Sequence, residues 1–298
     1  MENNGTPDGT THGIERPVRY GFLTSARLHD LYEDDRLASA ELIRRGHTVT
    51  PLIWTEPNDL DALDVIVMRT PWDWFHHRAP FRAQLEALGS VRARVVNTAA
   101  QMLAFADKTY LARLQAAGVS VVPTEQLAST ELHRVAEVLA QRGWAKAVLK
   151  PAFTANAIGA RRFDAADLSR VLAEIGTSPA GEPWLLQPFV PSIADGELSF
   201  IFFGGVFSHA VRKRPRADEW RVQHDYGGES APYVPSSMEI AEATELLSRS
   251  VPGTVYARVD AVEWQGRLHL MELEVVEPEL FFRHSARAPV LFADALGA

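Results

Sequence analysis

Charged side chains recur at every second position in two segments near the end of the chain. Arg258 and Asp260 alternate in YARVDAV, and Glu272 and Glu274 alternate in LMELEVV. Side chains two residues apart on a strand share a face, so Glu272 and Glu274 lie side by side. At about 6 Å and an effective dielectric of about 20, their repulsion is about 3 kcal/mol. A divalent cation would relieve this repulsion, and oxygen ligands without cysteine favour Mg²⁺, with Asp260 as a third ligand.

The register between the two segments decides whether Asp260 can take part. Residues 265–266 have the composition of a hairpin turn. A plain two-residue turn would pair Asp260 with Met271 and place it on the face opposite Glu272. An odd-length connection or a bulge would set Asp260 opposite Glu272, and we expect that arrangement. The alternative for both segments is a solvated strand face without metal.

Basic groups of two kinds could hold an anion. Lys150 ends the apolar strand AVLK, and the loop PAFTANAIGARRF that follows can fold over a phosphate bound by the lysine. Seven basic or titratable groups also occur within sixteen positions: His209, Arg212, Lys213, Arg214, Arg216, Arg221 and His224. In a chain of net charge -8 such a cluster would draw ATP or a carboxylate into a cleft. A solvated basic hairpin is the alternative.

The first part of the chain alternates strand and helix patterns. Strands are expected at residues 18–25, 47–54 and 64–69, with a helix after the first that stops at Gly46, which indicates a Rossmann-like parallel sheet. No G-x-G-x-x-G motif supports a dinucleotide site. Ligands bind at the carboxyl ends of such strands, so Arg69 can hold an anion and Asp73 an ammonium, with Trp72 between them. A surface loop with packed tryptophans is the alternative.

The remaining segments complete an α/β chain of three lobes. Helices are expected after a capping signal at residues 97–98, from 109 to 117, and from 131 to 142, with Lys108 between or within the first two. From Trp184 onward the pattern is rich in strands. We expect a disordered tail over residues 1–16, a Rossmann-like lobe over 17–96, a central lobe over 97–185 and a C-terminal lobe over 186–298.

Composition narrows the partners. The acidic balance and the lack of a long basic tract disfavour nucleic acid, and no apolar run approaches the roughly 18 residues of a membrane span. The polar first residues lack a signal-peptide core, and the absence of cysteine fits a reducing cytoplasm. A small molecule is the expected partner, and a homodimer is left open.

The order of these motifs resembles the ATP-grasp ligases, the family of glutathione synthetase and D-alanine:D-alanine ligase. ADKTYLARLQAAGVSVVPT resembles the segment of the first phosphate-binding lysine, Lys108, and AVLKPAFTANAIG that of the second, Lys150. WLLQPFV resembles the adenine hinge, which implies purine contacts from Gln187, Phe189 and Val190. The resemblance further implies two α+β lobes that clamp ATP.

Other segments extend the resemblance to the reaction centre. Glu197 falls where an acid usually holds the ribose. ARVD and MELEVVEPEL resemble the phosphate and metal motifs, which implies that Arg258 follows the moving phosphoryl group, with Lys213 as a second cation. The family more often has Asn where this chain has Glu274, and the loop after Lys150 has only Gly159 where relatives are often glycine-rich.

Finer motifs resemble a branch of the family. YEDD, the WD pair, SHAVRKRP, YGG and VEPELFF are similar to the cyclo-ligases that close O-ureido-D-serine into the antibiotic D-cycloserine. This implies a substrate site that includes Arg69, Trp72, Asp73, Arg221 and His224. The alternatives are an intermolecular amino-acid or dipeptide ligase, and a nucleotide-binding regulatory protein without ligase activity. A metal hydrolase using His76 and His77 is a remoter alternative, since no H-E-x-x-H motif exists.

Overall fold

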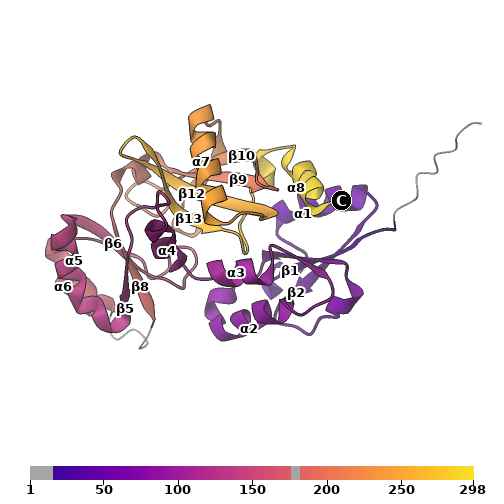
Figure 1. The fold of residues 1–298 in the computed structure, drawn as a ribbon, viewed down its shortest axis with the longest axis horizontal. Coiled ribbons are helices and arrows are strands. Elements are labelled where there is room, and N and C mark those ends of the chain that lie inside the picture. Colours follow the sequence, from indigo (N-terminus) through magenta and orange to yellow (C-terminus); the bar gives the residue numbers. More distant parts are fainter. Residues whose placement is uncertain (1–15, 176–181) are drawn as a thin grey trace, which may run out of the picture.

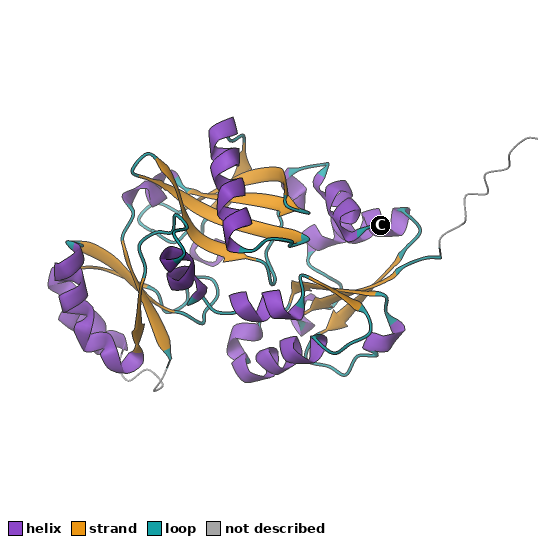
Figure 2. Cartoon of the chain, viewed as in Figure 1, coloured by secondary structure: helices purple, strands orange, loops and turns teal. Residues whose placement is uncertain are grey.

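The computed structural model of the chain describes residues 16–175 and 182–298, which form three sheets. The three sheets follow one another along an elongated molecule (Figure 1), and helices lie against each of them (Figure 2). The expectation of a disordered tail over residues 1–16 lies outside the described residues, except for Arg16. Among the described residues, no helix combines the length and apolar character needed to cross a membrane.

The first lobe is a parallel sheet in the order β2-β1-β3-β4. Its elements are β1 (Arg19–Thr24), α1 (Glu33–Arg44), β2 (Thr48–Ile53), β3 (Val65–Thr70), α2 (Arg78–Leu88) and β4 (Arg94–Val96), with 3₁₀ turns at Ala26–Leu28, Leu60–Ala62 and Trp74–His76. Every residue of β3 is buried, as expected for a strand of a parallel sheet covered on both faces. The Rossmann-like lobe is therefore confirmed.

The central lobe is an antiparallel sheet in the order β5-β8-β6-β7. Its elements are β5 (Glu125–Ala128), α5 (Val135–Arg142), β6 (Lys146–Pro151), β7 (Arg161–Asp164), α6 (Leu168–Ile175) and β8 (Pro183–Pro188), with 3₁₀ turns at Ser129–Arg134 and Ala165–Asp167. The lobe boundary expected at residue 185 falls inside β8, because Leu185 pairs with Lys150 and Leu186 with Leu149. The whole of β8 therefore belongs to the central sheet.

The C-terminal lobe is an antiparallel sheet in the order β11-β10-β9-β12-β13. Its elements are β9 (Glu197–Phe203), β10 (Val206–Arg214), β11 (Glu229–Tyr233), α7 (Ser237–Ser250), β12 (Tyr256–Trp264), β13 (Arg267–Glu274) and α8 (Ala288–Leu296), with 3₁₀ turns at Pro191–Asp195, His224–Tyr226 and Phe282–His284. Helix α8 lies beside α1 of the first lobe (Figure 1), and Phe292 packs edge-on against Phe22 of β1. The last helix thus joins the C-terminal lobe to the first lobe.

The hairpin of β12 and β13 has the expected register, reached through a bulge. Trp264 pairs with Arg267 across a two-residue turn, which alone would put Asp260 opposite Met271. The register shifts after Asp260, so that Met271 is the extra residue and Asp260 pairs with Glu272. The same register places Arg258 opposite Glu274. The prediction of facing charged pairs is confirmed.

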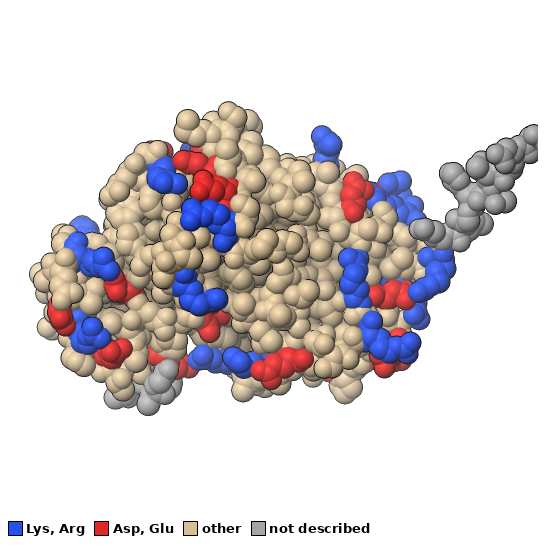
Figure 3. Space-filling view, in the orientation of Figure 1, with Lys and Arg blue, Asp and Glu red and all other residues tan. Residues whose placement is uncertain are grey.

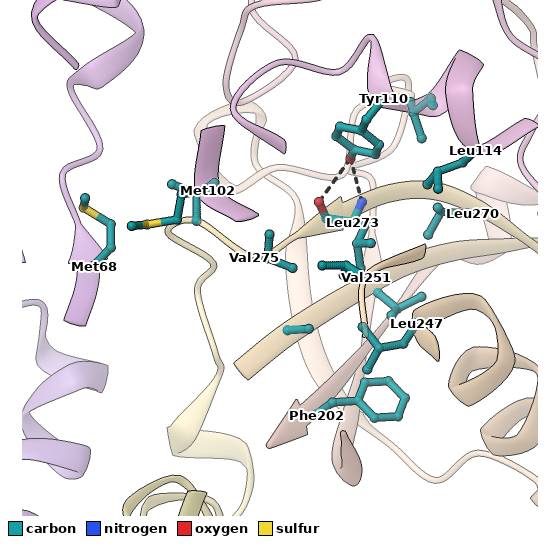
Figure 4. Packing of buried hydrophobic residues seen from close by; sticks show 14 of the residues in the cluster. Met68, Met102, Tyr110, Leu114, Phe202, Leu247, Val251, Leu270, Leu273 and Val275 are labelled. Carbon is teal, nitrogen blue, oxygen red and sulfur yellow. Dashed lines mark hydrogen bonds between the residues drawn. The ribbon is translucent and has the colours of Figure 1, made fainter. Parts of the chain in front are cut away.

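Helices α3 (Ala99–Phe105) and α4 (Tyr110–Ala116) pack on the apolar face of the C-terminal sheet (Figure 4). The Tyr110 hydroxyl donates to the carbonyl of Leu273 at 3.1 Å and accepts from its N–H at 2.8 Å. The segment expected to open the central lobe therefore rests on the last sheet. Because Leu273 lies between Glu272 and Glu274, this anchor also fixes Lys108, two residues before Tyr110, beside the acids.

Candidate active site

A pocket lies where the central and C-terminal sheets meet, and it encloses about 790 Å³ of space that is partly open to solvent. Apolar side chains from both sheets and from the connection after β8 form its walls: Val148, Val190, Ile193, Val262 and Met271. Lys108, Lys150 and Glu272 also line it. An apolar slot with charged groups beside it suits a planar base that carries phosphates.

Acids and cations alternate on the polar face of the C-terminal sheet. The two carboxylate oxygens of Asp260 accept from Arg258 Nε at 2.9 Å and from Lys213 Nζ at 3.0 Å, and Ser199 also donates to this carboxylate. Burial acts to raise the pKa of Asp260, but Arg258 and Lys213 outweigh it and hold the pKa well below its ordinary value. Asp260 is therefore ionised and already surrounded by donors.

The neighbouring acids are tied to the same two cations. Lys213 Nζ lies 2.5 Å from Glu197 Oε1, and Arg258 Nη2 lies 2.5 Å from Glu274 Oε1. Burial raises the pKa of Glu197, and it raises that of Glu274 to about 8. The carboxylate of Glu274 is thus paired with Arg258.

The two lysines reach the pocket from different elements and differ in their surroundings. Lys108, between α3 and α4, places Nζ 2.9 Å from Glu272 Oε1 and donates to the carbonyl of Thr154. Burial opposes its charge, but Glu272 more than compensates and raises its pKa. Lys150 pairs through its backbone with Leu185 of β8, but its side-chain ammonium has no hydrogen bond or ion pair with any described residue. Burial lowers its pKa to about 8.

The hinge after β8 lines the pocket, as the resemblance implies. Gln187 donates to Thr124 Oγ1 at 2.9 Å, and the Phe189 N–H donates to the carbonyl of Lys146 at 2.9 Å. The Phe189 amide hydrogen is therefore used within the central sheet and is not available to a purine. Gln223 was not singled out from the sequence, yet its Oε1 is buried without a partner among the described residues, and it lines the pocket.

The loop after β6 bridges all three lobes. Phe153 packs edge-on against Trp74 of the first lobe, with ring centroids 4.7 Å apart. Asn156 Nδ2 donates to Asp225 Oδ2 of the C-terminal lobe at 2.9 Å. Asn156 and Gly159 have φ of 51° and 79°, a left-handed conformation that glycine and asparagine tolerate. The loop that begins beside Lys150 thus lies folded across to the opposite lobe.

The expected role of Arg69 in binding an anion is wrong. Its side chain is 0% exposed and pairs with Asp35 at 2.8 Å, and it also donates to the carbonyl of Pro278. The carboxyl end of β3 therefore holds a buried ion pair in place of a free cation. Trp72 Nε1 donates to the carbonyl of Glu277, and Asp73 accepts from an indole of the same lobe, which leaves their substrate roles as predictions.

The expected cluster of seven basic groups does not form a single patch. Successive residues of β10 face opposite sides, so Lys213 lies in the site while Arg212 stacks over the ring of Tyr233 at 4.2 Å. Arg221 lines the pocket but pairs with Glu219 at 2.7 Å, and His224 is exposed outside it. On the face in Figure 3, the described acidic and basic side chains lie in small mixed groups without a broad patch of one sign.

The described residues hold no group of three acids or histidines arranged around one metal position. Asp260 accepts from Ser199, Lys213 and Arg258, whereas Glu272 and Glu274 lie side by side on one face of β13, with Glu272 lining the pocket. Mg²⁺ bound with a nucleotide commonly takes one or two carboxylates, with phosphate oxygens and water completing its shell. This pair fits such an ion, and Asp260 would have to give up a contact to join it.

Known proteins share both the sequence and the fold. The cycloserine biosynthesis protein DcsG of Streptomyces lavendulae is 31% identical over 257 residues, which cover 80% of this chain and 84% of that protein. A family model for the N-terminal domain of D-cycloserine synthetase DcsG matches residues 21–97. The crystal structure of D-cycloserine synthetase DcsG superposes with a TM-score of 0.81 at 27% identity, covering 93% of this chain and 98% of that one.

A more distant structure, the D-alanine--D-alanine ligase of Bacillus anthracis, shares the fold with a TM-score of 0.66 at 13% identity, over 94% of this chain and 95% of that one. Fold and site together define the class of this protein, an ATP-grasp ligase that forms carbon–nitrogen bonds using ATP. Within that class, the chain belongs to the family of the D-cycloserine synthetase DcsG.

Proposed function

We propose that the protein uses ATP and Mg²⁺ to phosphorylate the carboxylate of a small amino-acid-like molecule, which a nitrogen of the same molecule then attacks. The proposed substrate is O-ureido-D-serine and the product D-cycloserine, in antibiotic biosynthesis in the cytoplasm. The supporting observation is that lysines from two lobes, Lys108 and Lys150, converge on one pocket end with the facing pairs of β12 and β13. The similarity to DcsG supports the choice of substrate.

The charged side chains of the site have separate proposed roles. Lys150 has no ion-pair partner among the described residues and would bind nucleotide phosphate directly. Lys108 instead contacts both Glu272 and the carbonyl of Thr154. Arg258 and Lys213 share Asp260, so either cation can give up its contact with Asp260 to a transferring phosphoryl group while the other still pairs with that carboxylate. Mg²⁺, held by Glu272 and Glu274, would neutralise charge on the phosphate oxygens.

The reaction then proceeds by phosphoryl transfer, acyl transfer and a final hydrolysis. A substrate carboxylate oxygen attacks the γ-phosphorus and ADP leaves, which gives an acyl phosphate. The ureido nitrogen that is bonded to oxygen attacks the acyl carbon, loses its proton and expels phosphate, which closes the ring. Water then attacks the carbamoyl carbon, the ring nitrogen leaves and takes up a proton, and the carbamic acid formed breaks down to carbon dioxide and ammonia. Because the nucleophile and the carboxylate belong to one molecule, holding that molecule in a reactive conformation contributes most of the rate acceleration.

Phosphate release tests this function. The protein is incubated with ATP, Mg²⁺ and O-ureido-D-serine, and with other amino acids singly and in pairs. Release with O-ureido-D-serine alone, together with formation of D-cycloserine, is the expected result. Release that requires a pair of amino acids would show an intermolecular ligase, and tight ATP binding without substrate-dependent release would show a regulatory protein.

A further inference from the structure

Glu277, in the loop after β13, differs from the acids around it. Among the described residues it has no ion pair, and its partners are neutral: Trp74 Nε1, which donates to Oε1 at 2.6 Å, and its own backbone amide. Six acids of the neighbouring segments have a cationic partner: Asp35, Glu197, Asp260, Glu272, Glu274 and Glu279. Glu277 is therefore a partly buried carboxylate without a countercharge.

The carboxylate of Glu277 faces the first lobe, where it accepts from Trp74. It does not line the nucleotide pocket, yet Lys108 and Glu272 are among the charges that act on it. It also forms no metal-binding trio with other described residues. Its contacts with Trp72 and Trp74 place it where the loop after β13 meets the first lobe.

Aromatic rings of the first lobe and the loop after β6 surround this position. The Trp74 ring packs against Phe153, and Trp72 donates from its indole to the backbone carbonyl of Glu277. The ring of Tyr32 lies 5.0 Å from that of Trp72. Aromatic faces with a carboxylate among them attract organic cations and exclude anions.

We infer that Glu277 binds the ammonium group of the substrate, an inference that rests on the proposed function. In an α-amino acid the ammonium is attached to the carbon next to the carboxyl carbon, so its site must adjoin the place where the acyl phosphate forms. A chain of contacts connects Glu277 to the reaction centre. Trp74 donates to Glu277 and packs against Phe153, and the carbonyl of the next residue, Thr154, accepts from Lys108. The ammonium would supply the countercharge that the free protein lacks.

Glu277→Gln tests the inference with little change of shape. Glutamine keeps an oxygen that can accept from Trp74, so only the negative charge is lost. Glu263→Gln, on an exposed site of β12, is the matched control. Each protein is assayed with O-ureido-D-serine and with its analogue that lacks the α-amino group, and kcat/KM is measured for both substrates together with KM for ATP.

We expect the unmodified protein and the control to prefer the amine-bearing substrate by roughly ten- to a hundred-fold, the range for a hydrogen bond to a charged group. Glu277→Gln should lose most of that preference with KM for ATP unchanged. Equal use of both substrates by the unmodified protein, or full preference in folded Glu277→Gln, overturns the inference and leaves the ligase function standing. No phosphate release by the unmodified protein with either substrate overturns both.

Discussion

Two buried arginines show how differently a cation can be used in this molecule. Among the described residues, Arg69 of the first lobe pairs with one acid, Asp35, which has no other cation, and both side chains are fully buried. Arg258 of the C-terminal sheet shares Asp260 with Lys213 and also pairs with Glu274. A dedicated pair holds the fold together, whereas shared pairs can release one contact to a ligand and remain balanced.

Removing the dedicated cation should have the largest effect. Arg69→Met leaves Asp35 buried without a countercharge, which should lower the free energy of unfolding by about 3–5 kcal/mol. Urea unfolding followed by circular dichroism measures the change. Arg69→Met combined with Asp35→Leu should recover much of the loss, and a loss below about 1 kcal/mol in the single variant would contradict a structural role.

Breaking the shared network at its open end should instead affect turnover. Glu272→Gln keeps the volume but removes the partner of Lys108 and a proposed metal ligand, and it should lower kcat by about a hundred- to a thousand-fold. Because Glu272 is partly exposed, unfolding in urea should change by less than about 1 kcal/mol. Near-normal turnover would refute its assignment, and Glu263→Gln again serves as control.

The unpaired lysine should make ATP binding depend on pH. Burial lowers the pKa of Lys150 from 10.5 to about 8, and bound phosphate favours the charged form, so the pKa rises in the complex. ATP affinity should be constant below pH 8 and should fall as pH rises above it. Calorimetry of ATP binding between pH 7 and about pH 9.5 measures this.

Lys150→Met is the matching variant. It should weaken ATP binding by roughly ten- to a hundred-fold at pH 7 and remove the decline above pH 8. A decline of unchanged size in Lys150→Met would assign the titration to another group.

The smallest effect is expected at the loop that covers the pocket. Asn156→Ala removes the hydrogen bond to Asp225 that links the central and C-terminal lobes. A single exposed hydrogen bond of this kind contributes about 0.5–1.5 kcal/mol, so KM for ATP should rise by roughly two- to ten-fold with stability unchanged. Asp225→Ala should give the same increase, and the double variant should add nothing, because both changes remove one contact.

The register of the β12–β13 hairpin could be predicted from sequence because burial restricts the choices. The two-residue turn alone gives the wrong face, and only a bulge brings Asp260 opposite Glu272. The requirement that charged pairs meet therefore predicted a bulge, although not that Met271 would be the extra residue. The resemblance implied that Lys108 and Lys150 lie together, and both lysines line the pocket.

Long-range pairing could not be predicted. Arg69 ends a strand of a parallel sheet, where ligands usually bind, but Asp35 lies 34 positions earlier on a helix, and no local pattern links the two. The lobe boundary predicted at residue 185 was wrong for a similar reason. It cuts β8, whose partner strands β5 and β6 lie far from it in the sequence. The prediction of one basic cluster was wrong because successive residues of β10 face opposite sides, which separates Lys213 from Arg212.

The magnesium dependence of ATP binding tests the central claim most directly, namely that lysines of two lobes and the acids of β13 meet at one nucleotide. Calorimetry with and without Mg²⁺ would be run on the unmodified protein and on Glu272→Gln. We predict that Mg²⁺ strengthens ATP binding by the unmodified protein by at least about ten-fold and has little effect on the variant. Equal strengthening in both proteins would contradict a shared site.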